Sequence, residues 1–570
     1  MELSHVYERE LAYLHELGRS FAAAHPQSAG LLGERGHDPD VERLIEAVAF
    51  VSAGLRLHID RAAERQALRM IARLFPHFVR PLPAATVVEL APNLRTLRSI
   101  QRIARGKVIA SRPIDGTACR FTTCHDVDLA PLQITQLQVE SPARDRALLR
   151  LTLRVSDAGL GVLPGIDRLR LFVHHREPTL AATLGLWLGR YCEGITREGA
   201  PEGPRAALRP LAADPRSCVL PWPDATPIGV RTLVEGLAFP EVLGFFELSG
   251  LAALDLQGPE FTLVFAIGGE SRERPPLPRL PGTLPQGLVR LHCTPALNLF
   301  PIAAEAIEHL PGDGPRLLRA DGVDPRHTEV FEVEEVQIGR VKAPPRALTP
   351  AAAGPTHELE RSAGVDGGID TRLRILEGSA PAHDAAQVIS TRLWATNRDL
   401  AREIRQGDLG AGPLTVLLAS QTNVTPISAP LRPNLSGDRS WALVDHLEGT
   451  RSRLASAEGL RACFLLHDLP AAAGAPRGLL DSRRLTAIRG VERRRVHRLH
   501  EGAVIPVLET TIEIDEAVLS CLAEAEHLGA LADRLYASMT DLGSASAVDL
   551  VLQPSGHHLR WPVRLHEADA

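Results

Sequence analysis

Aromatic residues are scarce in this chain of 570 residues and make up only 4% of it. Long apolar runs are missing as well, since stretches such as 414–419 fall far short of the roughly 20 residues that a membrane-spanning helix needs. Any connection to a membrane is therefore expected to run through other proteins. The remaining composition, with 44% hydrophobic and 23% charged residues, is typical of a globular protein.

Cysteine is rare and the net charge is small. Seven cysteines, an odd number scattered from Cys119 to Cys521, do not fit a disulfide framework. No basic and then apolar leader opens the chain, which predicts a cytoplasmic location. The formal charge of -6 lacks the electrostatic footprint of a general nucleic-acid binder, so no nucleic-acid partner is expected.

Recognisable catalytic motifs are also missing. The sequence holds no Walker-type phosphate loop, no paired-histidine zinc helix and no nucleophile elbow. Gly159, Gly161 and Gly165 resemble a dinucleotide-binding loop only superficially, because the final glycine comes one residue late. A loop between two strands is the favoured interpretation, and the sequence predicts no catalytic residue, no cofactor and no enzyme activity.

Residues that could bind a metal are poorly grouped. Cys119, Cys124 and His125 are the only close sulfur and imidazole groups, whereas a tetrahedral zinc site takes four ligands from paired short spacings. His174 and His175 end an expected strand, where neighbouring side chains point to opposite faces. We expect core or loop positions for the first group, a surface pair for the second, and no metal site.

Two further segments could carry chemistry or binding. Segment 293–301 is apolar and uncharged, and because a reactive thiolate needs electropositive neighbours, Cys293 is expected in a buried structural segment. The densest basic run, Arg493 to Arg495 with Arg498, could meet phosphate or an acidic partner. Given the acidic net charge, a solvated loop that faces a partner is the favoured interpretation.

The N-terminal part of the chain has the pattern of three amphipathic helices. The first carries apolar residues at three-, four- and seven-residue steps up to Phe21 and is expected to end at Pro26. The second begins with Asp38 as its cap and Pro39 at the first helical position, where the missing N–H costs nothing. The third ends before Pro76. Such a helical bundle without catalytic residues indicates an assembly element.

Farther along, the pattern changes to two-residue alternation, as in 149–155 and 169–173, where one face is apolar and the other largely charged. These segments are expected to be half-buried antiparallel strands. The other expected elements are a short helix at 180–191, a surface excursion at 196–227, strands at 245–248, 261–265 and 504–514, a helix at 528–539, and a closing strand at 547–552.

The length predicts roughly three or four domains, and no repeat of the kind seen in solenoids or propellers is visible. We expect a multidomain α+β protein with an N-terminal helical bundle, mainly antiparallel β domains, and a C-terminal helix and strand. The expected regions are a helical assembly element at 1–80, a first β-rich region at 81–342, a linker or loop rich in Pro, Ala and Gly at 343–370, and a C-terminal α+β region at 371–570.

Several runs of the chain resemble one known family, and their order agrees with it from end to end. The runs are YERELAYL (7–14), DPDVERLIEA (38–47), LFPHF (74–78), AFPE (238–241), FFEL (245–248), CTPALNLFP (293–301), HTE (327–329), TNRDL (396–400) and RWP (560–562). On these residues the chain resembles the TssF (VasA/ImpG) family of baseplate wedge subunits of the bacterial type VI secretion system.

The resemblance implies a structural role, similar to that of wedge proteins in contractile phage tails. Two copies of a TssF-like chain are expected to join one TssG-like subunit and TssK, with self-association inside the wedge. Wedges surround the VgrG spike hub, and TssE and the sheath are further expected partners. The implied location is a cytoplasmic baseplate, docked at the inner face of the inner membrane, that supports assembly and contraction of tube and sheath.

Two alternatives stay open at this point. One is an enzyme whose active site comes from residues dispersed along the sequence, which would show turnover that a single pocket mutation abolishes. The other is an adaptor that recruits effectors, which would capture secreted cargo without TssG.

The N-terminal helices carry more apolar surface than a small helical cap needs, so we place the principal assembly contact there. A bundle between two copies of the chain and helices of the TssG-like subunit is expected. The alternative is that these stripes pack only on the chain's own β domain. The predicted interface residues are Leu3, Tyr7, Leu11, Leu14, Phe21, Val41, Leu44, Val48, Val51 and Leu55.

Overall fold

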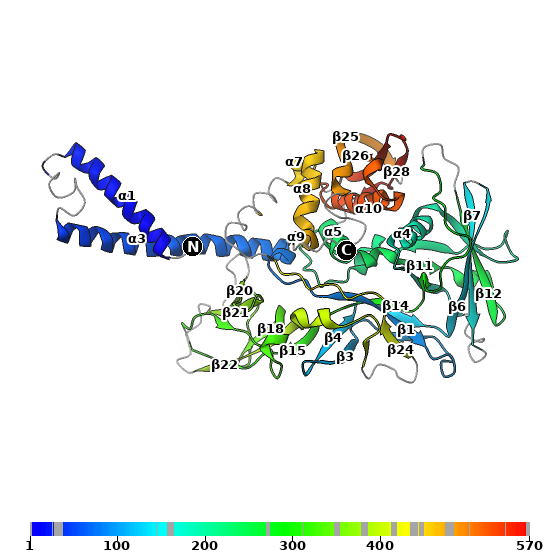
Figure 1. Ribbon diagram of the computed structural model, residues 1–570, viewed down its shortest axis with the longest axis horizontal. Helices are drawn as coiled ribbons and strands as arrows, with labels where there is room; N and C mark the ends of the chain where they lie inside the picture. The colour runs from blue at the N-terminus through cyan, green and yellow to red at the C-terminus, as the bar shows by residue number, and fades with distance from the viewer. Residues whose placement is uncertain are drawn as a thin grey trace. The chain divides into compact units, whose positions relative to one another are not determined.

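The computed structural model divides into two compact units. The helical unit comprises Met1–Arg73 with Leu435–Leu447, and the β-rich unit comprises Leu74–Asn434 with Glu448–Ala570. The structure describes residues 3–25, 27, 38–143, 145–156, 165–268, 274–310, 312–346, 354–377, 386–411, 419–433, 443, 450–472, 484–500, 502–541 and 543–565. It confirms the expected α+β class, with helices first and mostly antiparallel sheets after them (Figure 1).

Two long helices, α1 (Leu3–Ala24) and α3 (Pro39–Leu74), dominate the described part of the helical unit. The expected break between a second and a third helix was wrong, because α3 is continuous over 36 residues. Segment 56–67 contains neither proline nor glycine and is rich in good helix formers, so nothing interrupts the backbone ladder. The cap at Asp38 is confirmed, since its Oδ1 accepts the backbone N–H of Asp40 at 2.9 Å. Pro26 lies outside the described residues.

A six-stranded antiparallel sheet forms one layer of the β-rich unit. In spatial order its strands are β23 (Leu409–Ala411), β3 (Val108–Ile114), β4 (Thr117–Thr123), β14 (Cys293–Leu297), β1 (Ala85–Pro92) and β24 (Ala419–Asn423). Every residue of β14 is buried, which explains why this central strand reads as an uninterrupted apolar run rather than an alternating one. The expectation of a buried structural segment around Cys293 is confirmed. Beside this sheet lies a two-stranded one of β2 (Gln101–Ile103) and β5 (Val127–Leu129).

Two four-stranded sheets share a second core. One contains β6 (Leu132–Ala143), β7 (Arg146–Val155), β12 (Glu260–Ile267) and β9 (Cys192–Arg197), and the other contains β10 (Ala207–Pro210), β11 (Phe245–Ser249), β8 (Arg168–Val173) and β13 (Val289–Arg290). Alternate residues of β7 and β8 enter this core, which confirms the strands expected from two-residue periodicity. The expected short helix is α4 (Pro178–Leu186), continued by the π-turn Trp187–Tyr191.

The expectation of a surface excursion at 196–227 was wrong in part. Leu211, Val219 and Leu220 are buried in the largest core of the unit, beneath α5 (Ile228–Ala238). The carboxylate of Glu235 on this helix holds the segment in place, because it accepts the backbone N–H groups of Val219 and Leu220, each at 2.9 Å.

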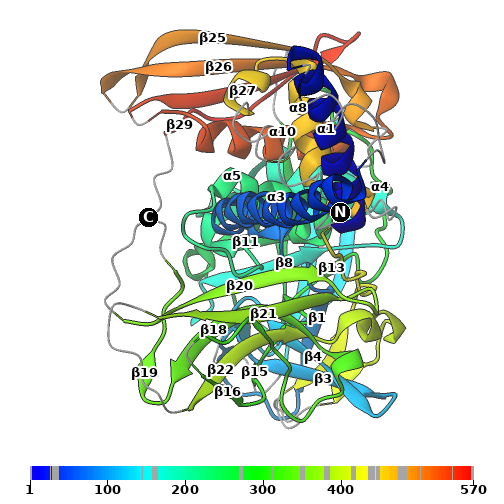
Figure 2. The same cartoon turned by 90° about the vertical axis from the view of Figure 1, so that its left-hand side faces the viewer.

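Two further sheets, formed by residues from the middle of the chain, lie together, as Figure 2 shows. One contains β15 (Phe300–Ala303), β22 (Gln387–Thr396), β18 (Glu329–Ile338), β19 (Val341–Lys342) and β16 (Ile307–His309), and the other contains β17 (Arg316–Leu317), β21 (Ile369–Leu376) and β20 (Thr356–Ala363). The stretch 343–370, expected as a linker or loop, thus holds β20, which pairs along its length with β21. Residues 347–353 of it lie outside the described residues.

The C-terminal part forms a five-stranded layer. Its strands are β25 (Ile488–His500), β26 (Ala503–Asp515), β27 (Ala545–Gln553), β28 (His558–Arg560) and β29 (Arg564–Leu565). Strands β26 and β27 are parallel, because helix α10 (Leu522–Ser538) crosses over between them. The expected C-terminal helix and strand are confirmed. The basic run from Arg493 to Arg498 was expected in a loop, which was wrong, because these residues pair along β26 as part of β25.

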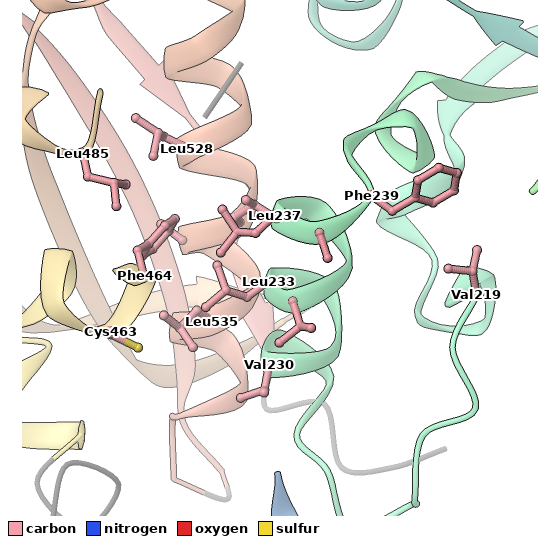
Figure 3. Packing of buried hydrophobic residues seen from close by; sticks show 14 of the residues in the cluster. Val219, Val230, Leu233, Leu237, Phe239, Cys463, Phe464, Leu485, Leu528 and Leu535 are labelled. Atoms are coloured by element: carbon pink, nitrogen blue, oxygen red, sulfur yellow. The ribbon is translucent and has the colours of Figure 1, made fainter. Parts of the chain in front are cut away.

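Close helix packing joins this layer to the rest of the unit. Side chains of α5, including Val230, Leu233 and Leu237, point toward Leu535 and Leu528 of α10 in Figure 3. The short helices α7 (Thr450–Arg453), α8 (Ala457–His467) and α9 (Leu469–Ala472) complete the set, and Phe464 of α8 is fully buried in the same core.

Candidate assembly interface

The helical unit is an antiparallel hairpin held by three cross-helix contacts. The His15 ring lies 2.9 Å from the Glu42 carboxylate, and Arg56 donates to Glu10 at 3.0 Å. The rings of Tyr7 and Phe50 meet edge to face, with centroids 6.4 Å apart. His15, farther along α1, meets Glu42 near the start of α3, whereas Tyr7 and Glu10, nearer the start of α1, meet Phe50 and Arg56 farther along α3. The two helices therefore run in opposite directions.

Small side chains line the seam of this hairpin. Val6 and Ala22 of α1 and Ala49 and Ala53 of α3 are at most 5% exposed. Alanine lets the helices approach closely, and it leaves the larger apolar residues of α3 on another face.

A second apolar stripe on α3 is left uncovered by α1. Its residues are 52% to 69% exposed and follow one another at steps of four, three, four and four residues: Leu44, Val48, Val51, Leu55 and Ile59. This spacing keeps all of them on one face and matches the seam of a coiled coil. Fully burying one such side chain contributes about 1.5–3 kcal/mol. The α3 stripe, as we name these five residues, has the features of a helix-binding surface.

Helix α1 also leaves apolar residues exposed. Tyr13, Leu17 and Phe21 follow at four-residue steps and are 48% to 59% exposed. The sequence interpretation overlooked Tyr13 and Leu17, as well as Phe50 and Ile59 of α3, because it followed one stripe on each helix. The four-residue spacing of the α1 residues was the available signal.

The ten predicted interface residues fall into two groups. Those half-buried inside the hairpin are Tyr7, Leu11, Leu14 and Val41. Those that remain exposed are Leu3, Phe21, Leu44, Val48, Val51 and Leu55. The exposed group stays a prediction of a partner surface, whereas the first group stabilises the hairpin that presents it.

Two of the family-like runs in the β-rich unit form buried hydrogen bonds inside the fold instead of a surface site. Asn298 donates through Nδ2 to Oδ1 of Asn397 at 2.8 Å, and its own Oδ1 accepts the backbone N–H of Asn397 at 2.7 Å. Both amides also bond the backbone of Arg120, so they join β4, β14 and β22. The runs CTPALNLFP and TNRDL therefore meet at one sheet corner and stabilise it.

A buried cluster surrounds the LFPHF run. The Nε2 of His77 lies 3.0 Å from the Nδ1 of His467, and burial, with His467 and Arg80 nearby, lowers the pKa of His77 well below its usual range. The Arg80 guanidinium lies over the ring of Phe331, 4.3 Å from its centroid, and donates to Glu332 at 2.8 Å. Burial lowers the pKa of Arg80 to about 10. The cluster is closed to solvent, which indicates a structural role.

The residues that could have carried chemistry are buried without activation. Burial raises the pKa of Cys119 to about 11 and that of Cys463 to about 12, and it raises the pKa of Cys293 well above its usual value. The expectation of core positions for Cys119 and His125 is confirmed by their burial. His174 stacks on Phe172 and is only half-buried. Gly159 and Gly161 lie outside the described residues.

The described residues hold neither a cluster of metal ligands nor a helix that could cross a membrane. In that part of the chain, no three His, Cys, Asp or Glu side chains gather as metal ligands. Of the helices that the structure describes, none has the length and apolar character required to cross a bilayer.

Two buried histidines of the β-rich unit are neutral in the folded chain. His125 donates from Nε2 to the backbone oxygen of Ser217 at 2.8 Å, and burial lowers its pKa to about 4. His292 accepts the backbone N–H of Ala130 at Nε2, and burial lowers its pKa to about 4 as well. Acceptance at Nε2 requires an unprotonated nitrogen, which agrees with the direction of the shift.

Acidification should therefore destabilise the chain. Below the unfolded pKa of 6.5 the unfolded state binds more protons than the folded state, so stability falls as the pH drops toward 4. At about pH 5 each of these histidines should cost about 2 kcal/mol of unfolding free energy relative to neutral pH. Urea denaturation midpoints at the two pH values measure the loss. His292→Asn should reduce it, exposed His58→Asn should not, and equal losses in all three proteins would contradict the assignment.

Comparison with known proteins links this sequence and its fold to one family. The profile of the family described as "Type VI secretion system, TssF" matches residues 1–568. The type VI secretion system component TssF1 of Pseudomonas aeruginosa is 30% identical over 372 residues. That match covers 60% of this chain and 58% of the relative, so it spans less than two thirds of the relative's length.

Two solved structures share the fold. A chain of the TssK-TssF-TssG baseplate subcomplex of the type VI secretion system superposes with a TM-score of 0.74 at 23% identity, covering 93% of this chain and 100% of that one. A chain of the baseplate complex from the type VI secretion system gives a TM-score of 0.60 at 22% identity, covering 99% and 100%. With the family profile matched over nearly every residue, this chain belongs to the TssF family of the type VI secretion system.

Proposed function

We propose that the chain is a structural wedge subunit of the type VI secretion baseplate and has no catalytic role. The observation that carries the proposal is the exposed α3 stripe, presented by a hairpin whose own seam is already filled. A helix face of this kind is stabilised when it packs against other helices. Membership of the TssF family supports the type VI secretion baseplate as the assembly in which this chain acts.

The partners follow from the same reasoning. The stripe would bind helices of a TssG-like subunit and of a second copy of this chain, with two copies for each TssG-like subunit. TssK joins this complex, and TssE, the VgrG spike and the sheath contact the assembled wedge. The baseplate lies in the cytoplasm and docks at the inner face of the inner membrane through other proteins. Its work is mechanical, because interface free energy is gained during assembly and redistributed during contraction.

Coexpression tests this proposal. The chain with its TssG-like partner should give a stable complex of two copies to one, and the chain alone should be less soluble, because unmatched apolar surfaces promote aggregation. Native mass measurement and pull-down report both results. A monodisperse monomer that does not bind the TssG-like subunit would contradict the proposal. Turnover in ester, phosphate or glycoside panels, abolished by a single pocket mutation, would favour an enzyme instead.

A further inference from the structure

A crevice rich in arginine lies in the β-rich unit. Its volume is about 260 Å³, and its walls come from β8, β10 and β11 on one side and from the β2–β5 region and segment 211–217 on the other. Its six arginines and four carboxylates are Arg102, Arg105, Arg168, Arg170, Arg209, Arg216, Asp126, Asp128, Asp214 and Glu247. Cations therefore outnumber anions here, although the whole chain carries a net charge of -6.

Most carboxylates of the crevice already accept hydrogen bonds from arginines of the crevice. Asp126 accepts from Arg102 at 2.5 Å and from the backbone N–H of Arg105 at 2.8 Å. Glu247 accepts two bonds from Arg209, at 3.1 and 2.8 Å. Asp214 caps a short helical turn and lies 3.5 Å from the same Arg209. Arg102 and Arg209 thus pair with three of the four carboxylates of the crevice.

The remaining arginines have no carboxylate partner among the described residues. The exposed side chains of Arg105, Arg168 and Arg216 form no ion pair in this part of the chain. Arg170 is more deeply placed. One of its terminal nitrogens donates to the backbone oxygen of Asp126 at 2.9 Å, while its Nε is buried without a partner. Burial lowers the pKa of Arg170, and the nearby carboxylates of Glu247, Asp128 and Asp126 oppose that shift, so its charge is partly compensated within the crevice.

A buried acceptor lies on the same wall. His125 is 9% exposed and lines the crevice. Its Nε2 donates to Ser217, so in the neutral ring its Nδ1 is an acceptor, and this atom is buried without a partner. The exposed guanidinium groups of the crevice are therefore the donors open to a carboxylate ligand, whereas the Nδ1 of His125 has almost no solvent-accessible surface.

We propose that this crevice binds an acidic extended peptide segment of a partner protein. The spacing of the arginines favours this ligand. Arg168 and Arg170 are two residues apart on β8, about 6.6 Å along the strand, and Glu247 and Arg209 follow opposite Arg170 on the next two strands. Carboxylates two residues apart on an extended peptide have the same spacing. Each arginine can hold its carboxylate in a two-pronged bond.

Other anions fit less well. A single phosphate needs donors that converge on one point, whereas these arginines are spread along and across the sheet. A nucleotide base would need an aromatic or broadly apolar surface, and no Phe, Tyr or Trp lines the crevice.

Fluorescence anisotropy with a labelled hexaglutamate peptide and the full chain tests the proposal. We expect saturable binding that weakens with salt, and no binding of a hexaglutamine peptide. Replacing Arg105, Arg168 and Arg216 together by Glu should weaken hexaglutamate binding by about tenfold or more, since three favourable charges become repulsive. The matched control replaces exposed Arg112, Arg319 and Arg495 by Glu and should bind hexaglutamate nearly as the unmodified chain does.

Three outcomes would overturn the proposal: no saturable hexaglutamate binding, equal loss in both triple variants, or displacement by inorganic phosphate at concentrations far below those of other salts. The last would assign a small-anion site. Should the triple variant fail to fold, the double variant Arg168→Gln and Arg216→Gln applies the same test without charge reversal. Failure here leaves the wedge assignment intact, because that rests on the TssG-like complex.

Discussion

One charge at position 44 is expected to abolish assembly and leave the chain folded. Leu44 is 66% exposed, so in Leu44→Asp the carboxylate is solvated in the free chain. In a helical bundle the same carboxylate would be buried without a partner, at a cost of several kcal/mol. A loss of about 3 kcal/mol weakens binding more than a hundredfold. Pull-down with the TssG-like subunit measures the loss, and circular dichroism checks the fold.

Leu14→Asp should behave differently, because Leu14 is half-buried inside the hairpin. This substitution should unfold the helical hairpin itself, so helix content falls as well as assembly. The control is Gly54→Asp, which places the same charge on α3 where an added Cβ would meet nothing within 4 Å. Normal assembly of Leu44→Asp would show that the α3 stripe is not the partner surface. Equal loss of assembly in Gly54→Asp would show that any added charge on α3 disrupts the complex, whether or not it lies in the stripe.

The second large effect is expected where α5 crosses α10. A Cβ at Gly229 would lie 2.4 Å from the backbone oxygen of Arg534 and 2.7 Å from the Cα of Leu535. Backbone atoms cannot rotate away as a side chain can, so Gly229→Val would push the two helices apart. Because this crossing lies in the largest core, we expect a loss of more than about 3 kcal/mol of unfolding free energy.

Gly54→Ala is the matched control for the crossing, since both glycines lie in helices and Gly54 has open space. It should be neutral or stabilise the chain by up to about 1 kcal/mol, because alanine is the better helix former. Thermal or urea unfolding of the β-rich unit measures Gly229→Val, and unfolding of the helical unit measures Gly54→Ala. A Gly229→Val protein as stable as the unmodified one would show that α5 and α10 are not packed as closely as described.

Much of the local structure follows from the sequence pattern. Two-residue alternation located β7 and β8, and Asp38 with Pro39 located the start of α3. The pattern was less informative where a strand is covered only in part. Most residues of β25 are exposed or half-buried, and its run of arginines shows no alternation with apolar residues, so it was interpreted as a loop. Only the register with β26 makes this segment a strand.

Family membership and the period of most elements were thus determined by the sequence itself, because motifs and local backbone preferences are properties of neighbouring residues. The tertiary structure decided which face of each element is buried and which is exposed. Antiparallel pairing of α1 and α3 leaves Leu14 half-buried and Leu44 exposed, although both belong to apolar stripes of similar appearance. In the same way, the charged face of β8 lines a crevice because segments distant in sequence pack opposite it. Burial depends on contacts between distant segments, and no local pattern contains them.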